Sequence, residues 1–103
     1  MVKESVVTDY MDYCFICGAP KEHTHHLIEG VANRQKSDKY KLIVPVCGNC
    51  HNMSKDSIHG NTKMDAMSKI IGQLAFEREE VANGLTKEQA REKFRKEFGK
   101  SYL

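Results

Sequence analysis

Residues 42–51 read Leu-Ile-Val-Pro-Val-Cys-Gly-Asn-Cys-His, and this stretch decides most of the fold. Its first half is rich in aliphatic and β-branched residues, which predicts a strand over residues 42–46. Pro45 has no backbone N–H to donate, so the strand is expected to lie at a sheet edge or to end there. The second half, Cys47 to Cys50, is a Cys-x-x-Cys turn, in which two thiolates are spaced to bind one metal ion.

The other two of the four cysteines form a second Cys-x-x-Cys turn upstream, at Cys14 and Cys17. Zn²⁺ prefers four tetrahedral thiolate or imidazole ligands, so the two turns together supply one complete site. A redox pair or buried free thiols are the alternative interpretations, although a redox pair needs only one such turn. We therefore predict a structural Zn²⁺ bound by Cys14, Cys17, Cys47 and Cys50.

Composition indicates one small domain that needs a stabilising element besides its hydrophobic core. The chain has 103 residues, of which 40% are hydrophobic, and its net charge of +2 permits an anionic partner without requiring one. A core of this size seldom stabilises a domain unaided, which favours a metal. No run approaches the roughly 18 apolar residues of a membrane span, and residues 1–10 lack the apolar centre of a signal peptide. We expect a cytoplasmic protein with reduced thiols and no membrane partner.

The second half of the chain is expected to form a helical hairpin. Asn61 or Thr62 can cap a long helix, and Gly84 is expected to end it in the left-handed conformation. Thr86 then opens a capping box for a second helix. The apolar stripe of the first helix, at Met64, Met67, Ile71, Leu74 and Val81, is expected to pack on Ala90, Phe94 and Phe98 of the second. A homodimer through the same helices is left open.

Histidines supply the second chemical signal of the sequence. His25 and His26 lie in a predicted strand over residues 23–28, where neighbouring side chains point to opposite faces. They therefore cannot serve one task in the same way: one can bind a metal ion while the other transfers a proton, since imidazole titrates near neutral pH. His51 directly follows Cys50, and His23 and His59 complete the set, with the role of His23 left open.

Residues 29–41 are expected to form a loop between the two strands, and this loop is basic. Cations close to the histidines could follow the phosphate backbone of DNA, whereas an ordinary solvated loop is the alternative interpretation. The candidate DNA contacts are Arg34, Lys36, Lys39 and Lys41.

Three motifs now stand in a recognisable order: Cys14-x-x-Cys17, then His25-His26-Leu-Ile-x-Gly30, then residues 42–51 ending in Cys-x-x-Cys-His. This order resembles the zinc-bound HNH (His-Me finger) endonucleases, above all small phage-type members. The resemblance covers residues 14–59. It implies an α+β fold within a single domain, residues 1–103. A ββα-metal core with two zinc knuckles is expected over residues 12–60, followed by the C-terminal helical extension over residues 61–103.

The resemblance also implies roles for the histidines. By position, His26 matches the general base, and His25 and His51 match ligands of one catalytic divalent ion. His51 would open a short helix that runs to about residue 57, and His59 matches a further ligand or a phosphate contact. The implied activity is hydrolysis of DNA phosphodiester bonds to 5′-phosphate and 3′-hydroxyl ends. Imidazole ligands favour Mn²⁺, Ni²⁺ or Zn²⁺ over Mg²⁺.

Two positions depart from the family pattern. Lys55 stands where many relatives carry another polar ligand, and Tyr40 and Lys41 stand where the middle Asn is usual, with Asn33 as a candidate for that loop-fixing role. Both departures favour the alternative function, a non-catalytic zinc-stabilised module that binds DNA or a phage protein such as a packaging terminase. The adjacent pair of histidines and His51 favour the nuclease, because a plain zinc ribbon leaves them unexplained.

Overall fold

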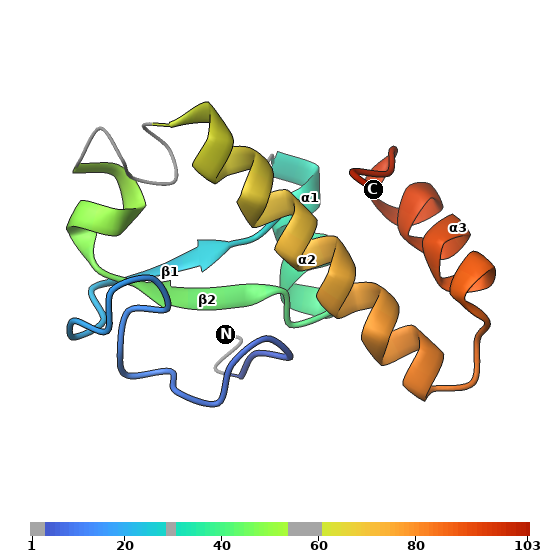
Figure 1. The fold of residues 1–103 in the computed structure, drawn as a ribbon, viewed down its shortest axis with the longest axis horizontal. Coiled ribbons are helices and arrows are strands. Elements are labelled where there is room, and N and C mark those ends of the chain that lie inside the picture. Colours follow the sequence, from blue (N-terminus) through green and yellow to red (C-terminus); the bar gives the residue numbers. More distant parts are fainter. Residues whose placement is uncertain (1–3, 29–30, 54–60) are drawn as a thin grey trace.

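A computed structural model describes residues 4–28, 31–53 and 61–103. Within these residues, an antiparallel two-stranded sheet combines with helices, so the α+β class is confirmed (Figure 1). None of the described helices has both the length and the apolar character that a membrane crossing requires. In chain order the elements are β1 (His23–His26), α1 (Val31–Lys39), β2 (Ile43–Val46), a short π-helical turn η1 (Asn49–Met53), α2 (Thr62–Ala82) and α3 (Lys87–Phe98).

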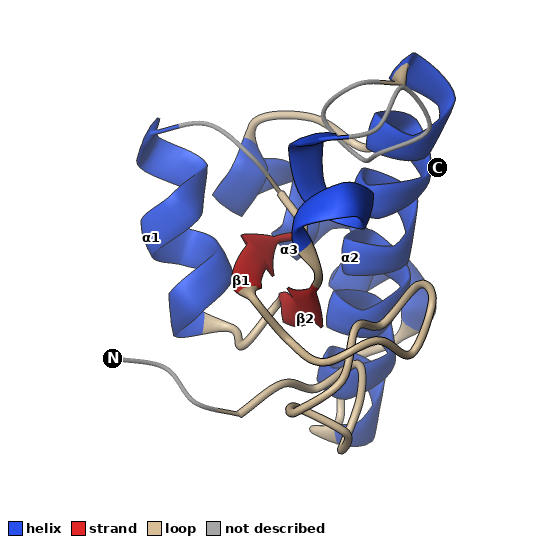
Figure 2. Cartoon of the chain, turned by 90° about the vertical axis from the view of Figure 1, so that its left-hand side faces the viewer, coloured by secondary structure: helices blue, strands red, loops and turns tan. Residues whose placement is uncertain are grey.

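The sheet lies between α1 on one side and α2 on the other (Figure 2). β1 pairs with β2 so that His25 is opposite Val44 and His26 is opposite Ile43. Since side chains alternate along a strand, the adjacent His25 and His26 face different helices: His25 contacts Ser68 of α2, and His26 contacts Asp38 of α1. The fold therefore separates His25 from His26, as the sequence predicts for neighbours in a strand.

The hydrophobic core joins the sheet to the helical hairpin. Leu27 and Ile28, just after β1, are fully buried, and the rings of Phe76, Phe94 and Phe98 pack beside them. The ring centroids of Phe76 and Phe94 are 5.3 Å apart, and those of Phe94 and Phe98 are 4.6 Å apart. The Phe76 centroid is also 6.0 Å from that of Phe98, so both phenylalanines of α3 contact Phe76 and hold α3 against α2, as predicted for Phe94 and Phe98.

The predicted loop over residues 29–41 is wrong, because most of it forms α1. This helix is polar on nearly every side, so it carries no apolar stripe from which a helix could be predicted. It is anchored through Ser37, whose Oγ donates to the Ile28 carbonyl at 3.0 Å and whose carbonyl accepts from the Leu42 N–H at 2.7 Å. Asn33 consequently lies in a helix, not in a loop that it could fix.

The predicted ends of the long helices are confirmed. The Asn61 side chain caps α2 by accepting from the N–H groups of Lys63 and Met64. Thr86 and Gln89 form the capping box of α3. Gly84 follows α2 with a φ of 110°, in the region that favours glycine.

The predicted packing face of α2 is wrong. Met67 and Leu74 are each 53% exposed. Met64 and Met67 instead line a groove with Phe15 and Ile16 of the first cysteine turn. The buried face of α2 consists of Ser68, Gly72, Gln73, Ala75, Phe76 and Glu80.

Gly72 explains this rotation of α2. A Cβ placed on it would lie 2.8 Å from the Ile28 Cδ1 atom and 3.0 Å from the Leu27 Cβ atom, so a larger residue would push α2 or these two side chains aside. Small residues thus decide which face of α2 is buried, and a search for apolar periodicity passes over them.

Candidate metal centre and histidine site

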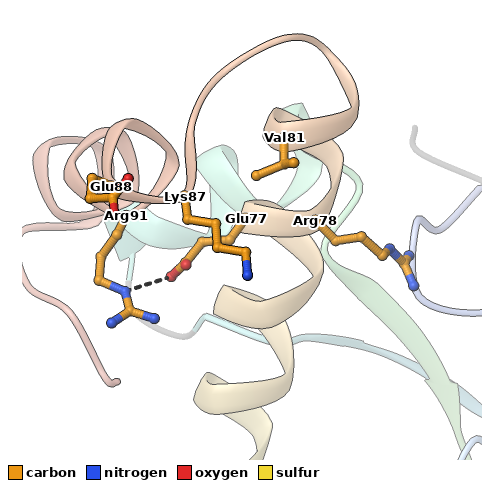
Figure 3. Close-up of a pocket in the computed structure, with 6 residues that line it drawn as sticks. All are labelled: Glu77, Arg78, Val81, Lys87, Glu88 and Arg91. Atoms are coloured by element: carbon orange, nitrogen blue, oxygen red, sulfur yellow. Dashed lines mark hydrogen bonds and ion pairs between the residues drawn. The ribbon is translucent and has the colours of Figure 1, made fainter.

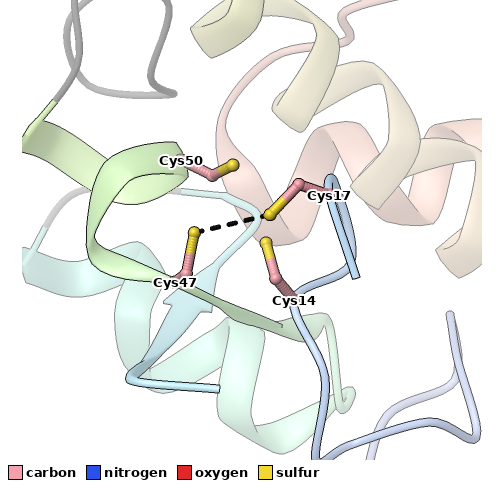
Figure 4. Close-up of side chains that lie close together, drawn as sticks. All are labelled: Cys14, Cys17, Cys47 and Cys50. Carbon is pink, nitrogen blue, oxygen red and sulfur yellow. Dashed lines mark hydrogen bonds between the residues drawn. The ribbon is translucent and has the colours of Figure 1, made fainter. Parts of the chain in front are cut away.

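The sulfur atoms of Cys14, Cys17, Cys47 and Cys50 all lie within 4.8 Å of one another. The Sγ atoms of Cys17 and Cys47 are 3.6 Å apart, and all four side chains point to one place (Figure 4). Four thiolates bound to Zn²⁺ at about 2.3 Å are about 3.8 Å from each other, so the spacing fits. The predicted cluster is confirmed as a group that can hold a structural metal ion such as zinc.

Backbone hydrogen bonds bring the two cysteine turns together. Gly18, with a φ of 79°, tightens the first turn by donating its N–H to the Cys14 carbonyl at 2.9 Å. The Phe15 N–H donates to the Pro45 carbonyl at 2.7 Å and so fastens this turn to the end of β2. Because the second turn follows β2 directly, the two pairs of sulfurs meet.

The environment of the sulfurs favours a bound cation. Burial is the largest influence on Cys14 and raises its pKa, but N–H groups of Cys17, Cys47 and Ile16 donate to its sulfur and lower the pKa to about 6. Burial, followed by the neighbouring sulfurs, raises the pKa of Cys50. Sulfurs this close can all be thiolates only when a cation offsets their charge.

His51 lies at the centre of a group of imidazoles beside the sulfurs. Its Nδ1 atom is 2.8 Å from the Nδ1 atom of His23, and the two rings are edge to face at 84°. The ring centroids of His25 and His51 are 5.5 Å apart. The N–H of His51 donates to the Cys47 carbonyl at 3.0 Å, so the second cysteine turn fixes the backbone that carries this ring.

His25 is 1% exposed, and its hydrogen bonds determine which nitrogen carries the proton. The Ser68 hydroxyl donates its single proton to the Leu27 carbonyl at 2.9 Å, and its Oγ lies 2.8 Å from His25 Nε2. The hydroxyl must therefore accept from the Nε2–H, which leaves the lone pair of the neutral ring on Nδ1. Metal-binding histidines are commonly held through their other ring nitrogen in this way.

His26 lies on the opposite face of β1 and contacts α1. Its Nε2 atom is 2.9 Å from Asp38 Oδ1, and the two side chains are 23% and 43% exposed. The carboxylate accepts the Nε2–H and thereby orients the ring, with the lone pair on Nδ1. Asp38 was not among the predicted site residues, because its place opposite β1 depends on a helix that the sequence does not reveal.

The four predicted DNA contacts have different surroundings in the structure. The Lys36 ammonium donates to the Glu97 carbonyl of α3, and the Lys41 ammonium pairs with Glu4 Oε2 at 3.1 Å. The Lys39 ammonium lies 5.1 Å from the centroid of the neighbouring Tyr40 ring. Arg34 is exposed on α1. The predictions for His59 and Lys55 lie outside the described residues.

A separate cleft of about 540 Å³ lies between α2 and α3, at the far end of α2 from η1 (Figure 3). Acidic and basic side chains alternate in it, and Arg91 Nε lies 3.4 Å from Glu77 Oε2. The described residues that line it include no histidine or cysteine, so their metal-binding chemistry lies elsewhere. The lining residues are Glu77, Arg78, Val81, Lys87, Glu88 and Arg91.

Comparisons with protein-family models, with curated proteins and with solved structures found no match to this chain. The site is therefore interpreted from its own geometry. The cysteine quartet is the one group of three or more candidate ligands in residues 4–28, 31–53 and 61–103 whose ligand atoms lie within 4.8 Å. The histidines are brought close to it and to one another, but they are less tightly gathered than the sulfurs.

Proposed function

We propose that this chain is a metal-dependent DNA endonuclease built on a zinc-stabilised ββα-metal core. The observation that supports this proposal best is the gathering of His23, His25 and His51, with the backbone of His51 bonded to the Cys47 carbonyl and His23 paired with Val46. Four sulfur ligands already complete a structural zinc site, which therefore needs no imidazole ligand. Metal-assisted phosphodiester hydrolysis uses a divalent ion and a base: the imidazoles can hold the ion, and the paired His26 and Asp38 can supply the base.

His26 is the proposed general base. Its Nδ1 lone pair can take a proton from the attacking water, while Asp38 keeps the ring oriented and stabilises the imidazolium that forms. The His26 side chain is 23% exposed, so water can reach it. General bases of this kind typically contribute about 10²–10⁴-fold to a rate.

His25 and His51 are the proposed ligands of the catalytic ion, which can be Mn²⁺, Ni²⁺, Zn²⁺ or Mg²⁺. When bound, such an ion stabilises charge on the phosphate and on the leaving 3′ oxygen. Ser68 orients the His25 ring through Nε2, and the Cys47 turn holds the backbone of His51. Since His25 and His26 leave β1 on opposite faces, the scissile phosphate would lie across the end of this strand.

DNA is the proposed partner, bound through its phosphates. Arg34 on α1 is exposed one turn before Asp38, so its guanidinium can contact a backbone phosphate close to His26. Lys39 ends the same helix and Lys41 follows two residues later, so both can extend this contact along the DNA backbone. Such contacts position DNA without reading its sequence.

Plasmid cleavage tests this proposal. Zinc-loaded protein is expected to convert supercoiled plasmid to nicked or linear forms with Mn²⁺, Ni²⁺ or Mg²⁺. The His26→Ala variant should lose this activity while keeping its zinc and its melting temperature. Thr24→Ala, on the same strand and face, is the matched control and should cleave normally. Equal cleavage by His26→Ala would remove His26 from the mechanism.

The second candidate is a non-catalytic module that binds DNA or a phage protein such as a terminase. The exposed side chains of Phe15, Ile16 and Met67 along one groove favour protein binding. In that case the zinc-loaded protein would remain folded and would leave plasmid intact with every ion tested.

A further inference from the structure

His23 has no assigned role in the proposed chemistry, yet it is the histidine that lies closest to His51. It is two residues before His25 in β1, so both side chains leave the strand on the same face. Its ring meets the ring of His51 edge to face, with centroids 5.0 Å apart. Two segments far apart in sequence thus present their imidazoles to each other next to the second cysteine turn.

The distance between the two nitrogens suits a shared ion. The Nδ1 atoms of His23 and His51 are 2.8 Å apart. When two imidazole nitrogens bind one ion at about 2.0–2.1 Å and the two metal–nitrogen bonds are at right angles, the nitrogens are about 3 Å apart. The pair therefore needs only a small adjustment to bind the same ion.

Neighbouring residues hold the pair in place. His51 is fixed through its N–H bond to the Cys47 carbonyl. His23 is fixed by its position in β1, where it pairs with Val46, the residue just before Cys47. Both rings are thus carried by backbone that the sulfur cluster fastens, and a metal site needs such supported ligands.

We propose that His23 and His51 bind one divalent transition ion through their Nδ1 atoms. His23 would then be a ligand in the catalytic site, a role that rests on the proposed function, whereas metal binding by the pair does not. Nitrogen donors favour Ni²⁺, Zn²⁺ or Mn²⁺ over Mg²⁺ and Ca²⁺. The remaining positions around the ion are open to His25, water or a phosphate oxygen.

Calorimetric titration of untagged, zinc-loaded protein with Ni²⁺ tests this site, with zinc content measured before and after. We expect one Ni²⁺ per chain in addition to the retained zinc. His23→Ala and His51→Ala should each weaken Ni²⁺ binding more than about tenfold, since even the loss of a residue that only supports a ligand costs about 10–100-fold. His26→Ala is the matched control and should bind Ni²⁺ normally, because this ring faces α1.

A His23→Asn variant separates ligation from folding. Asparagine can still hydrogen-bond to His51 but is a poor ligand for Ni²⁺, so this variant should melt like the wild type and still bind Ni²⁺ weakly. Unchanged Ni²⁺ binding in both His23 variants, or no Ni²⁺ uptake beyond zinc in the wild type, would overturn the inference. Ni²⁺ binding that depends on His23 without any plasmid cleavage would retain the inference and reject the nuclease. Metal-dependent cleavage that is unchanged in His23→Ala would retain the nuclease and reject His23 as a ligand of its catalytic ion.

Discussion

The sulfur cluster and the histidine group lie side by side but are organised differently. The four sulfurs are mutually within 4.8 Å, and two of the cysteines are buried. Among the imidazoles, His23 and His51 are in contact, His25 is one ring away, and His26 faces the opposite helix. A closed set of four protein ligands is typical of structural zinc sites, whereas catalytic sites keep positions for water or substrate. In the proposed function, the sulfurs form the stabilising site and the imidazoles form the reactive one.

The largest expected effect comes from breaking the sulfur cluster. Structural Zn²⁺ in small zinc domains contributes about 10–16 kcal/mol of apparent binding free energy, which is as large as the whole stability of a domain. Cys47→Ser should therefore lose zinc and its cooperative thermal unfolding. Metal analysis after dialysis and circular dichroism measure the two outcomes.

His23→Ala is the matched control for this change, because it alters the histidine group and leaves the sulfurs intact. It should retain one zinc per chain and its unfolding transition. A Cys47→Ser protein that keeps a full equivalent of zinc would contradict the assignment of the quartet.

The next effect concerns the support of the reactive site by α2. Ser68→Ala removes the hydroxyl that accepts from His25 Nε2, so the ring loses the partner that fixes its tautomer. We expect Ni²⁺ affinity to fall about 10–100-fold while zinc content stays the same. Ser68→Thr retains the hydroxyl and should restore binding.

Nitrogen-15 chemical shifts of the His25 ring report the tautomer directly and would not move if Ser68 only filled space. A ring that remains protonated on Nε2 in Ser68→Ala would show that the serine has no positioning role.

The smallest expected effects come from substituting two cations of α1, Arg34 and Lys36, which should change different properties. Arg34→Ala should weaken DNA binding and reduce by about one the slope of log affinity against log salt, as expected when one phosphate contact is lost. Lys36→Ala should instead cost about 1–2 kcal/mol of stability, since its ammonium joins α1 to the Glu97 carbonyl of α3. Fluorescence anisotropy with a labelled duplex and thermal melting distinguish the two, and an unchanged affinity and salt slope in Arg34→Ala would show that this side chain does not contact a phosphate.

Local chemistry made part of this molecule predictable. The two Cys-x-x-Cys turns predict the cysteine cluster, because the type and spacing of the ligands can be read from neighbouring residues. The caps at Asn61 and Thr86 are visible for the same reason, since each depends on residues within one turn. The alternation along β1 likewise predicted that His25 and His26 would be separated.

Tertiary packing decided what the sequence could not predict. α1 is stabilised by contacts such as Ser37 to the Ile28 carbonyl, not by an apolar stripe, so the sequence pattern predicts a loop there. The face of α2 that is buried depends on the close approach at Gly72. Asp38 could not be paired with His26 before α1 was known, and the contact between His23 and His51 depends on where η1 lies.

X-ray absorption at the zinc and nickel edges, on zinc-loaded protein with one added equivalent of Ni²⁺, tests the division between the two sites most directly. The zinc edge should show four sulfurs at about 2.3 Å, and the nickel edge should show only nitrogen and oxygen neighbours at about 2.0–2.1 Å. Sulfur around nickel, or imidazole nitrogen around zinc, would contradict two separate sites with separate tasks.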